Sequence, residues 1–468
     1  MTRTLKADLV VADLAASDRV DTSLLLEELK GRYRATGRPL DVSFRGLVGW
    51  VKPGDRLTHL VHPYPAKLLP HIAHFFAHAS SLRRVGPNVL DPFAGSGTVA
   101  LEASIAGAKP LVADANPLAL LVAKVKTTPY DSDVLVDEAR RLKDRIRRLR
   151  TAPSIKVLNE HIWYFPETKQ ALERILRAVL EVEDEDVRDF FRVCFSVVAR
   201  RLSRADPSIS VPVRLAPKPR LSAASNKAIR SHLRWIKETS PSDEFLKVVQ
   251  ANIARVLATN RAFRGRLPCV VVGTDARVLK DDLDRRLESE SIHLTITSPP
   301  YGSAQKYIRS SSLSLNWLSL CSPDELANLE GRSIGREHLP AKLSAPLVPL
   351  LPSVAEVLGS TLDRIRAKNS HRASITETYL SEMTAALGEM VRVTAPGGSI
   401  ALVVGNNTVA GFALPNDQVI SAVLDHLGMR LELALKDTIH SRGLLTARHA
   451  TAGVIGGETI LLYRKSLK

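Results

Sequence analysis

The stretch HLTITSPPYGSAQKYI, residues 293–308, contains a strand pattern that stops abruptly. Apolar and polar residues alternate through residues 292–297, which predicts a β-strand. Ser298, Pro299, Pro300 and Tyr301 follow it directly. Because neither proline has an N–H for a neighbouring strand, the strand must end there. A serine, fixed backbone carbonyls and a tyrosine therefore stand together at a strand end.

An earlier stretch, PNVLDPFAGSGTVALEASIAGAKPLVADANPLAL at residues 87–120, predicts a strand, a glycine-rich turn, a helix and a second strand. Gly95 and Gly97 allow a tight turn and a close approach of the backbone to a ligand. The helix that follows presents unpaired N–H groups at its start. Asp114 ends the second strand, where an acidic residue typically holds ribose hydroxyls. This βαβ unit predicts a parallel sheet with a ligand at its strand ends, although a GxG turn also serves dinucleotide enzymes.

Composition limits the possible partners of the chain. It has 468 residues and a formal net charge of +16, which favours a nucleic-acid partner. Cys194, Cys269 and Cys321 are far apart, so we expect no disulfide framework or metal site, and a reducing cytoplasm. No apolar run approaches the roughly 20 residues that span a membrane, so we expect no membrane partner.

The pattern along the chain divides it into three parts. Residues 1–125 hold an N-terminal segment and the βαβ unit, and residues 268–468 return to alternating strands and helices. Residues 126–267 are rich in helical periodicity and in basic residues. We therefore expect one α/β domain that is interrupted by a mostly helical insertion.

DPFAGSGT at residues 91–98, followed by TSPPY at residues 297–301, resembles the DNA amino-methyltransferases that use S-adenosylmethionine (SAM). Motif I of that family reads DPFxGSGT, and motif IV reads Ser, Asp or Asn before Pro-Pro and an aromatic residue. The serine form is typical of enzymes that methylate N4 of cytosine. The resemblance implies a Rossmann-like class I fold with a mixed seven-stranded sheet, and site-specific methylation of double-stranded DNA by base flipping. Methylation of N6 of adenine, or of an amino group in RNA, stays open as an alternative.

The resemblance also assigns roles to residues. Ser298 and the carbonyl of Pro299 would accept hydrogen bonds from the target amino group, Pro300 would fix the backbone, and Tyr301 would stack on the flipped base. The segment HLVHPYPAKLLPHIAHFF, residues 59–76, resembles the motif that holds the methionine end of SAM, and VVVGTDARVL resembles the strand that contacts its adenine. The expected cofactor-binding residues are Lys67, Asp91, Pro92, Phe93, Ala94, Gly95, Gly97, Thr98, Asp114 and Asp275.

Two basic stretches are candidates for contact with DNA phosphates: residues 200–237, and the segment that follows TSPPY. The residues concerned are Arg200, Arg201, Arg214, Lys218, Arg220, Arg230, Arg234, Arg332 and Arg336. The sequence leaves open whether a cognate restriction endonuclease accompanies the chain, and whether the chain is a monomer or a dimer.

Two further readings compete with amino methylation. A carbon-5 cytosine methyltransferase needs a cysteine nucleophile, often in a Pro-Cys pair, and Pro268-Cys269 is such a pair. It precedes an apolar strand rather than standing in a loop at a strand end, so we expect Cys269 to be buried. A catalytically silent DNA-binding protein with the same fold is the other reading, and intact motifs argue against it.

Overall fold

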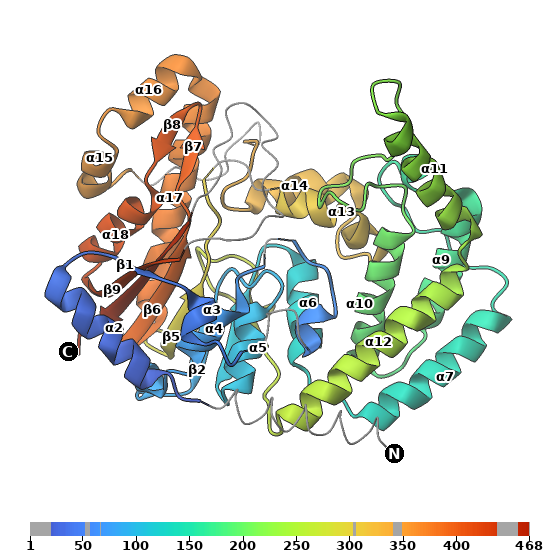
Figure 1. The fold of residues 1–468 in the computed structure, drawn as a ribbon, viewed down its shortest axis with the longest axis horizontal. Coiled ribbons are helices and arrows are strands. Elements are labelled where there is room, and N and C mark those ends of the chain that lie inside the picture. Colours follow the sequence, from blue (N-terminus) through green and yellow to red (C-terminus); the bar gives the residue numbers. More distant parts are fainter. Residues whose placement is uncertain are drawn as a thin grey trace.

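The computed structural model describes residues 20–51, 57–65, 67–302, 306–339, 349–437 and 457–467. At its centre lies an eight-stranded sheet of order β1-β9-β10-β6-β5-β2-β3-β4 (Figure 1). Its strands are β1 (Leu40–Val42), β2 (Asn88–Asp91), β3 (Lys109–Ala113), β4 (Val270–Gly273), β5 (Ile292–Thr297), β6 (Thr394–Val404), β9 (Met429–Asp437) and β10 (Glu458–Lys465). A separate antiparallel hairpin consists of β7 (Asn407–Val409) and β8 (Phe412–Leu414).

Neighbouring strands of the large sheet are parallel, except that β10 runs antiparallel to both β6 and β9. This topology confirms the predicted Rossmann-like α/β class. The expected number of seven strands is wrong for the described chain, because β1 adds an eighth at the edge beside β9. A strand of three residues is too short to show a period of two in the sequence.

Helices cover both faces of the sheet. The helices before the insertion are α2 (Ser23–Thr36), α3 (Phe44–Leu47), α4 (Pro70–Ala77), α5 (Thr98–Ile105) and α6 (Pro117–Thr127). Those after it are α13 (Tyr307–Trp317), α14 (Leu326–Arg332), α15 (Pro352–Leu358), α16 (Thr361–Lys368), α17 (Ser370–Val393) and α18 (Asn416–His426). Short 3₁₀ turns occupy Leu57–Leu60, Ser80–Arg83 and Pro323–Glu325.

Strand β6 shows how the sheet is buried between these helices. Ile400 and Leu402 join a core with residues of α15 to α18, whereas Ala401 and Val403 join a second core with residues of α2 to α5. Consecutive side chains of a strand point to opposite faces, so a strand that is covered on both sides needs an uninterrupted apolar run. Residues 400–404, IALVV, supply that run.

The insertion is helical, as predicted. It contains α7 (Ser132–Arg148), α8 (Glu160–Trp163), α9 (Pro166–Leu180), α10 (Glu185–Arg201), α11 (Ala223–Glu238) and α12 (Pro241–Ala262). Phe190, Phe195 and Phe245 from these helices share one core with Leu118 of α6 and Trp317 of α13. The insertion therefore packs directly against elements that flank both motifs, while the division at residues 125 and 267 stays a prediction. Among the described helices, none has the length and apolar composition of a membrane span.

The glycine-rich turn has a steric reason for Gly97. This residue precedes α5 with φ +71°, and a Cβ there would lie 2.7 Å from Cα and Cβ of Ala123 in α6. Any side chain would therefore force α5 and α6 apart, in addition to straining the backbone. The turn can hold the two helices at this spacing only with glycine.

We expect Gly97→Ala to lower the free energy of unfolding by about 2–4 kcal/mol, since strain and overpacking add. Gly107→Ala is the matched control, because Gly107 also has a positive φ (+73°) but no atom within 4 Å of the added Cβ. Its expected cost is only about 1–2 kcal/mol. Urea unfolding of both variants measures the difference, and equal losses would contradict the steric argument.

Candidate active site at the ends of β2 and β5

The two motifs meet because β2 and β5 are adjacent parallel strands. Asp91, the last residue of β2, is 4 % exposed and accepts a 2.6 Å hydrogen bond from Thr297 Oγ1 at the end of β5. Its Oδ1 also accepts from the N–H of Phe93. Burial raises the pKa of Asp91 to about 7, against the effect of these donors. The carboxylate of Asp91 in DPFAGSGT is thus bonded to Thr297, the residue that precedes Ser298.

The DPFAGSGT turn is also bound to the end of β3. The N–H of Ala94 donates to the carbonyl of Ala113, and the N–H of Gly95 donates to Asp114 Oδ2 at 2.7 Å. Asp114 Oδ1 accepts from the N–H of Asn116 at 2.8 Å. Burial raises the pKa of Asp114 to about 6. The structure therefore brings the expected cofactor residues of the turn and Asp114 together, with Pro92 and Thr98 buried and Phe93 half-buried beside them.

Three polar residues outside the predicted site join this arrangement: Asn116, Tyr64 and Ser311. Asn116 caps the start of α6, and its Nδ2 donates to Tyr64 Oη at 2.9 Å and to Ser311 Oγ at 3.0 Å. A Cβ on Gly95 would lie 3.9 Å from Cε1 of Tyr64. Asn116 thus links the segment before motif I to helix α13 after motif IV. The sequence held a signal for this helix cap, because Asn116 stands between Asp114 at the strand end and Pro117 at the start of a helix.

Lys67 is bonded to the segment that precedes it, and its expected contact with the cofactor stays a prediction. Its Nζ donates to the carbonyl of His59 at 3.2 Å, and the side chain is half-buried. His62 is buried, with Nε2 3.0 Å from Ser196 Oγ, and burial lowers its pKa to about 3. The imidazole is therefore neutral at physiological pH.

TSPPY occupies the position that its prolines predicted. The strand ends at Thr297, Ser298 is half-buried, and Pro299 and Pro300 are buried. Tyr301 Oη donates to Glu458 Oε1 at 3.3 Å, at the start of β10. Burial, together with the carboxylate of Glu458, raises the pKa of Tyr301 well above its usual value, so the phenol stays protonated.

Residues after β6 hold the backbone around Tyr301. A Cβ on Gly405 would lie 3.0 Å from the Tyr301 ring, so only a glycine lets the ring lie this close. Asn407 Nδ2 donates to the carbonyl of Gly302. The buried Asn416 donates to the carbonyl of Gly405 at 2.9 Å and to Asn407 Oδ1 at 3.1 Å. Asn407 and Asn416 could not be predicted as part of the site, because no sequence motif marks them.

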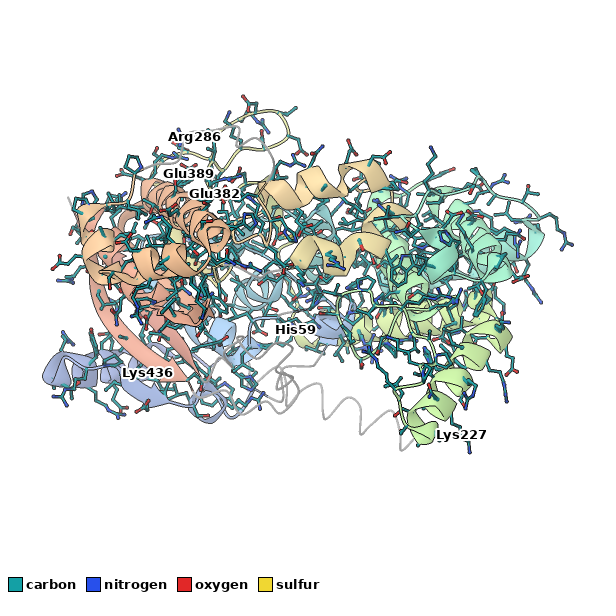
Figure 2. The ribbon with its side chains drawn as sticks, turned by 90° about the horizontal axis from the view of Figure 1, so that it is seen from above. His59, Lys227, Arg286, Glu382, Glu389 and Lys436 are labelled. Carbon is teal, nitrogen blue, oxygen red and sulfur yellow. The ribbon has the colours of Figure 1, made fainter. Side chains whose placement is uncertain are left out.

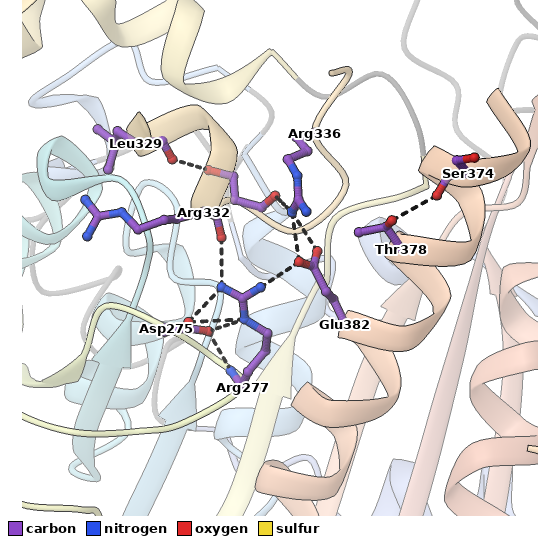
Figure 3. A network of polar contacts seen from close by, with 9 residues as sticks. Asp275, Arg277, Leu329, Arg332, Arg336, Ser374, Thr378 and Glu382 are labelled. Atoms are coloured by element: carbon purple, nitrogen blue, oxygen red, sulfur yellow. Dashed lines mark hydrogen bonds and ion pairs between the residues drawn. The ribbon is translucent and has the colours of Figure 1, made fainter. Parts of the chain in front are cut away.

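Asp275 follows β4 and is bound by a neighbouring arginine. Its carboxylate accepts from the backbone N–H of Arg277 at 2.9 Å, and from Nε and Nη2 of that residue (Figure 3). The side chain of Asp275 remains 41 % exposed. The contact with adenine that the resemblance implies stays a prediction.

The candidate DNA contacts separate into two groups. Arg214, Arg220, Arg230, Arg234 and Arg332 are exposed, and Lys218 is half-buried. Arg200 instead donates to the carbonyls of Asp206 and Ile209, and Arg201 pairs with Glu244. Arg336 is 3 % exposed and pairs with Glu382. We therefore withdraw Arg336 as a phosphate contact, because its guanidinium lies inside the protein.

Cys269 lies directly before β4 and is half-buried rather than buried as expected. The environment of its thiol raises its pKa to about 11 through desolvation, so the reactive thiolate is disfavoured. This is the opposite of what a nucleophilic cysteine requires.

One group in the described chain has the composition of a metal site. His74, His78 and Glu102 are buried, and one ligand atom from each lies within 4.8 Å of the others. Both oxygens of Glu102 are already engaged, with His59 Nε2 at 2.8 Å and His74 Nδ1 at 3.0 Å. These bonds tie α5, which follows the DPFAGSGT turn, to both ends of the segment that carries Lys67.

The chain is similar in sequence to two Type II methyltransferases. No protein-family model matches the chain. It is 26 % identical over 385 residues to the Type II methyltransferase M.MvaI of Kocuria varians, which covers 78 % of this chain and 80 % of that protein. It is 28 % identical over 184 residues to the Type II methyltransferase M.MjaII of Methanocaldococcus jannaschii, which covers 38 % and 34 %.

Solved structures give weaker similarities. The chain shares 20 % identity and a TM-score of 0.22 with a putative DNA modification methylase of Thermus thermophilus complexed with S-adenosyl-L-methionine, over 42 % of this chain and 54 % of that one. It shares 10 % identity and a TM-score of 0.29 with the rRNA methyltransferase AviRa of Streptomyces viridochromogenes, over 86 % and 87 %. The two relatives found by sequence are both Type II methyltransferases.

Proposed function

We propose that this chain is a SAM-dependent DNA methyltransferase that methylates N4 of cytosine in double-stranded DNA. The observation that carries the proposal is the 2.6 Å hydrogen bond between Thr297 and Asp91, which places the DPFAGSGT turn beside Ser298–Tyr301. A cofactor turn and a set of amino-group acceptors at adjacent strand ends are what direct methyl transfer needs. The Type II methyltransferase relatives support the same activity.

The residues of the turn fit SAM. Gly95 and Gly97 have φ of +49° and +71°, which opens the backbone to a ligand. Asp114 is held by two backbone N–H groups, so its carboxylate is oriented to accept from ribose hydroxyls. When bound, SAM would supply the methyl group in electrophilic form. Lys67 and Asp275 would hold the ends of the cofactor.

The chain contributes orientation and polarisation to this step. An exocyclic amino nitrogen is a poor nucleophile, because its lone pair is delocalised into the ring. Ser298 Oγ and the carbonyl of Pro299 accept hydrogen bonds from the amino hydrogens, which localises that lone pair on the nitrogen. The ring of Tyr301, held between Gly405 and Glu458, offers a fixed face for the flipped base.

Helix α11 is the part of the insertion best suited to the DNA backbone. Only Ile236 of this helix is buried, and Figure 2 shows Lys227 near its outer end. Arg230 and Arg234 are exposed and take part in no ion pair of the described residues. In Figure 1, α11 rises on one side of α13 and α14, and α16 with the β7–β8 hairpin rises on the other. Unpaired cations on a projecting helix match a phosphate backbone.

The activity is tested by incubating the protein with labelled SAM and unmethylated genomic DNA, followed by nucleoside mass spectrometry. We expect N4-methylcytosine, and Ser298→Ala should lower its formation roughly 10²–10³-fold, as loss of a preorganised polar group does. SAM binding should change less than about twofold. Ser312→Ala, whose hydroxyl bonds only within α13, is the control.

Other products would change the assignment in defined ways. Formation of N6-methyladenine would make adenine the target base in place of cytosine. Label found in RNA alone would make RNA the substrate in place of DNA. An unchanged rate in Ser298→Ala would remove the serine from the mechanism.

SAM binding is expected to strengthen as the pH rises through about 6. Asp114 has a pKa of about 6, and only its ionised form accepts at both oxygens. At pH 5 about one molecule in ten carries the ionised form, so affinity should be up to about tenfold lower than at pH 8. Isothermal titration of the wild type and of Asp114→Asn measures this. A pH dependence that is equal in both proteins would contradict the role of Asp114.

The double variant Arg230→Ala/Arg234→Ala should weaken DNA binding and reduce the salt slope of log K by about 1–2. The matched control is Arg140→Ala/Arg141→Ala on α7, where the arginines are 75 % and 72 % exposed but pair with Asp137 and Glu138. Fluorescence anisotropy at several salt concentrations compares the two. Equal slopes would show that the cations of α11 contact no phosphate.

A further inference from the structure

Two arginines and two carboxylates form one network between α14, α17 and the turn after β4 (Figure 3). Arg277 binds Asp275 and also donates from Nη1 to Glu382 Oε1 of α17 at 2.7 Å. Glu382 accepts in addition from Arg336 Nη1, at 2.9 and 2.8 Å. The two positive and two negative side chains balance, so the network is neutral as a unit.

The network is bonded to both ends of the short segment 332–336. Arg277 Nη2 donates to the carbonyl of Arg332 at 3.1 Å, at the end of α14. Arg336 Nη1 donates to the carbonyl of Ser333 at 3.1 Å, while its guanidinium is held by Glu382. Residues 332–336 are therefore bonded to Arg277, which also holds Asp275, and to Glu382 through Arg336.

This segment lies against TSPPY. Gly335 has φ +76°, and a Cβ on it would lie 3.1 Å from the carbonyl oxygen of Tyr301 and 3.3 Å from Cβ of Pro300. The backbone at Gly335 therefore supports the backbone of the catalytic stretch. Glycine is required here both by its conformation and by this close approach.

Burial makes the network stiff. The side chains of Arg336, Glu382 and Arg277 are 3 %, 12 % and 23 % exposed. Removal of one partner from such a set leaves an uncompensated buried charge, whereas an exposed ion pair contributes little. The arrangement is thus a continuous series of contacts from Asp275 to Tyr301.

We propose that Glu382 is a positioning residue that couples the cofactor carboxylate Asp275 to the catalytic stretch Ser298–Tyr301, through Arg277, Arg336 and Gly335. The inference rests on the proposed function and extends it. One ion network positions both Asp275 and the stretch Ser298–Tyr301. A displacement of Asp275 moves Ser298–Tyr301, and the reverse also holds. Cofactor affinity and methyl transfer therefore both depend on the carboxylate of Glu382.

The first test is Glu382→Gln, measured by SAM affinity and by the single-turnover rate of transfer to genomic DNA. We expect both to fall by roughly 2- to 30-fold, the range for residues that modulate coupling. The matched control is Glu377→Gln, since Glu377 lies on the same helix and pairs with Arg366, but at the surface. It should change both quantities less than about twofold.

If the role of Glu382 is purely structural, Glu382→Gln should lower the melting temperature and the active fraction, but leave the SAM affinity and transfer rate of each folded molecule unchanged. That result would overturn the proposal. If Glu382→Gln does not fold, Arg277→Gln takes its place, because Arg277 stands in a turn after β4.

A double-mutant cycle of Asp275→Asn and Arg336→Gln tests the coupling itself, because the two side chains are linked through Arg277 and Glu382. We expect the double variant to lose less activity than the product of the single losses, by about threefold or more. A loss equal to that product overturns the proposal. The SAM affinities give the same cycle without methyl transfer, so the coupling can be judged even where the wild type methylates no DNA.

Discussion

A single hydrogen bond between two strand ends organises this site. Asp91 and Thr297 are 206 residues apart in sequence, yet their side chains meet at 2.6 Å because β2 and β5 are neighbours in the sheet. A buried carboxylate needs donors, and the hydroxyl of the last residue in β5 is one of them. The strands fix the direction of both chains at this point, so the turn after Asp91 and the prolines after Thr297 leave the sheet side by side.

Later segments then enclose Tyr301 from several sides. Gly405 lies under its ring, Gly335 lies against its backbone carbonyl, and Glu458 accepts from its hydroxyl. Gly302, the next residue, leaves no room for a Cβ beside Tyr379 of α17. Residues 301 and 302 are thus held by contacts from four separate parts of the chain, and the direct transfer that we propose requires preorganisation of this kind.

The sequence predicted the motifs, their strands and the helical insertion, because each of these has a local pattern. It predicted Asp114 beside the DPFAGSGT turn, since parallel strands end at one edge. It could not predict Asn116 or Glu458 as neighbours of the motifs, because their contacts arise from tertiary packing. It also treated all arginines of the basic stretches alike, whereas folding pairs Arg336 with Glu382 and leaves Arg230 exposed. The strand β1 was missed because it is only three residues long.

The antiparallel strand β10 has a consequence for the way the protein is made. It lies between β6 and β9, and both of these precede it in the chain. Until residues 458–465 have left the ribosome, β6 and β9 each present an unpaired edge, and Tyr301 lacks the carboxylate of Glu458. The DPFAGSGT turn, whose strands are β2 and β3, can form much earlier. During synthesis the two halves of the candidate site are therefore separated in time: the DPFAGSGT turn can form first, and the surroundings of Tyr301 are completed last.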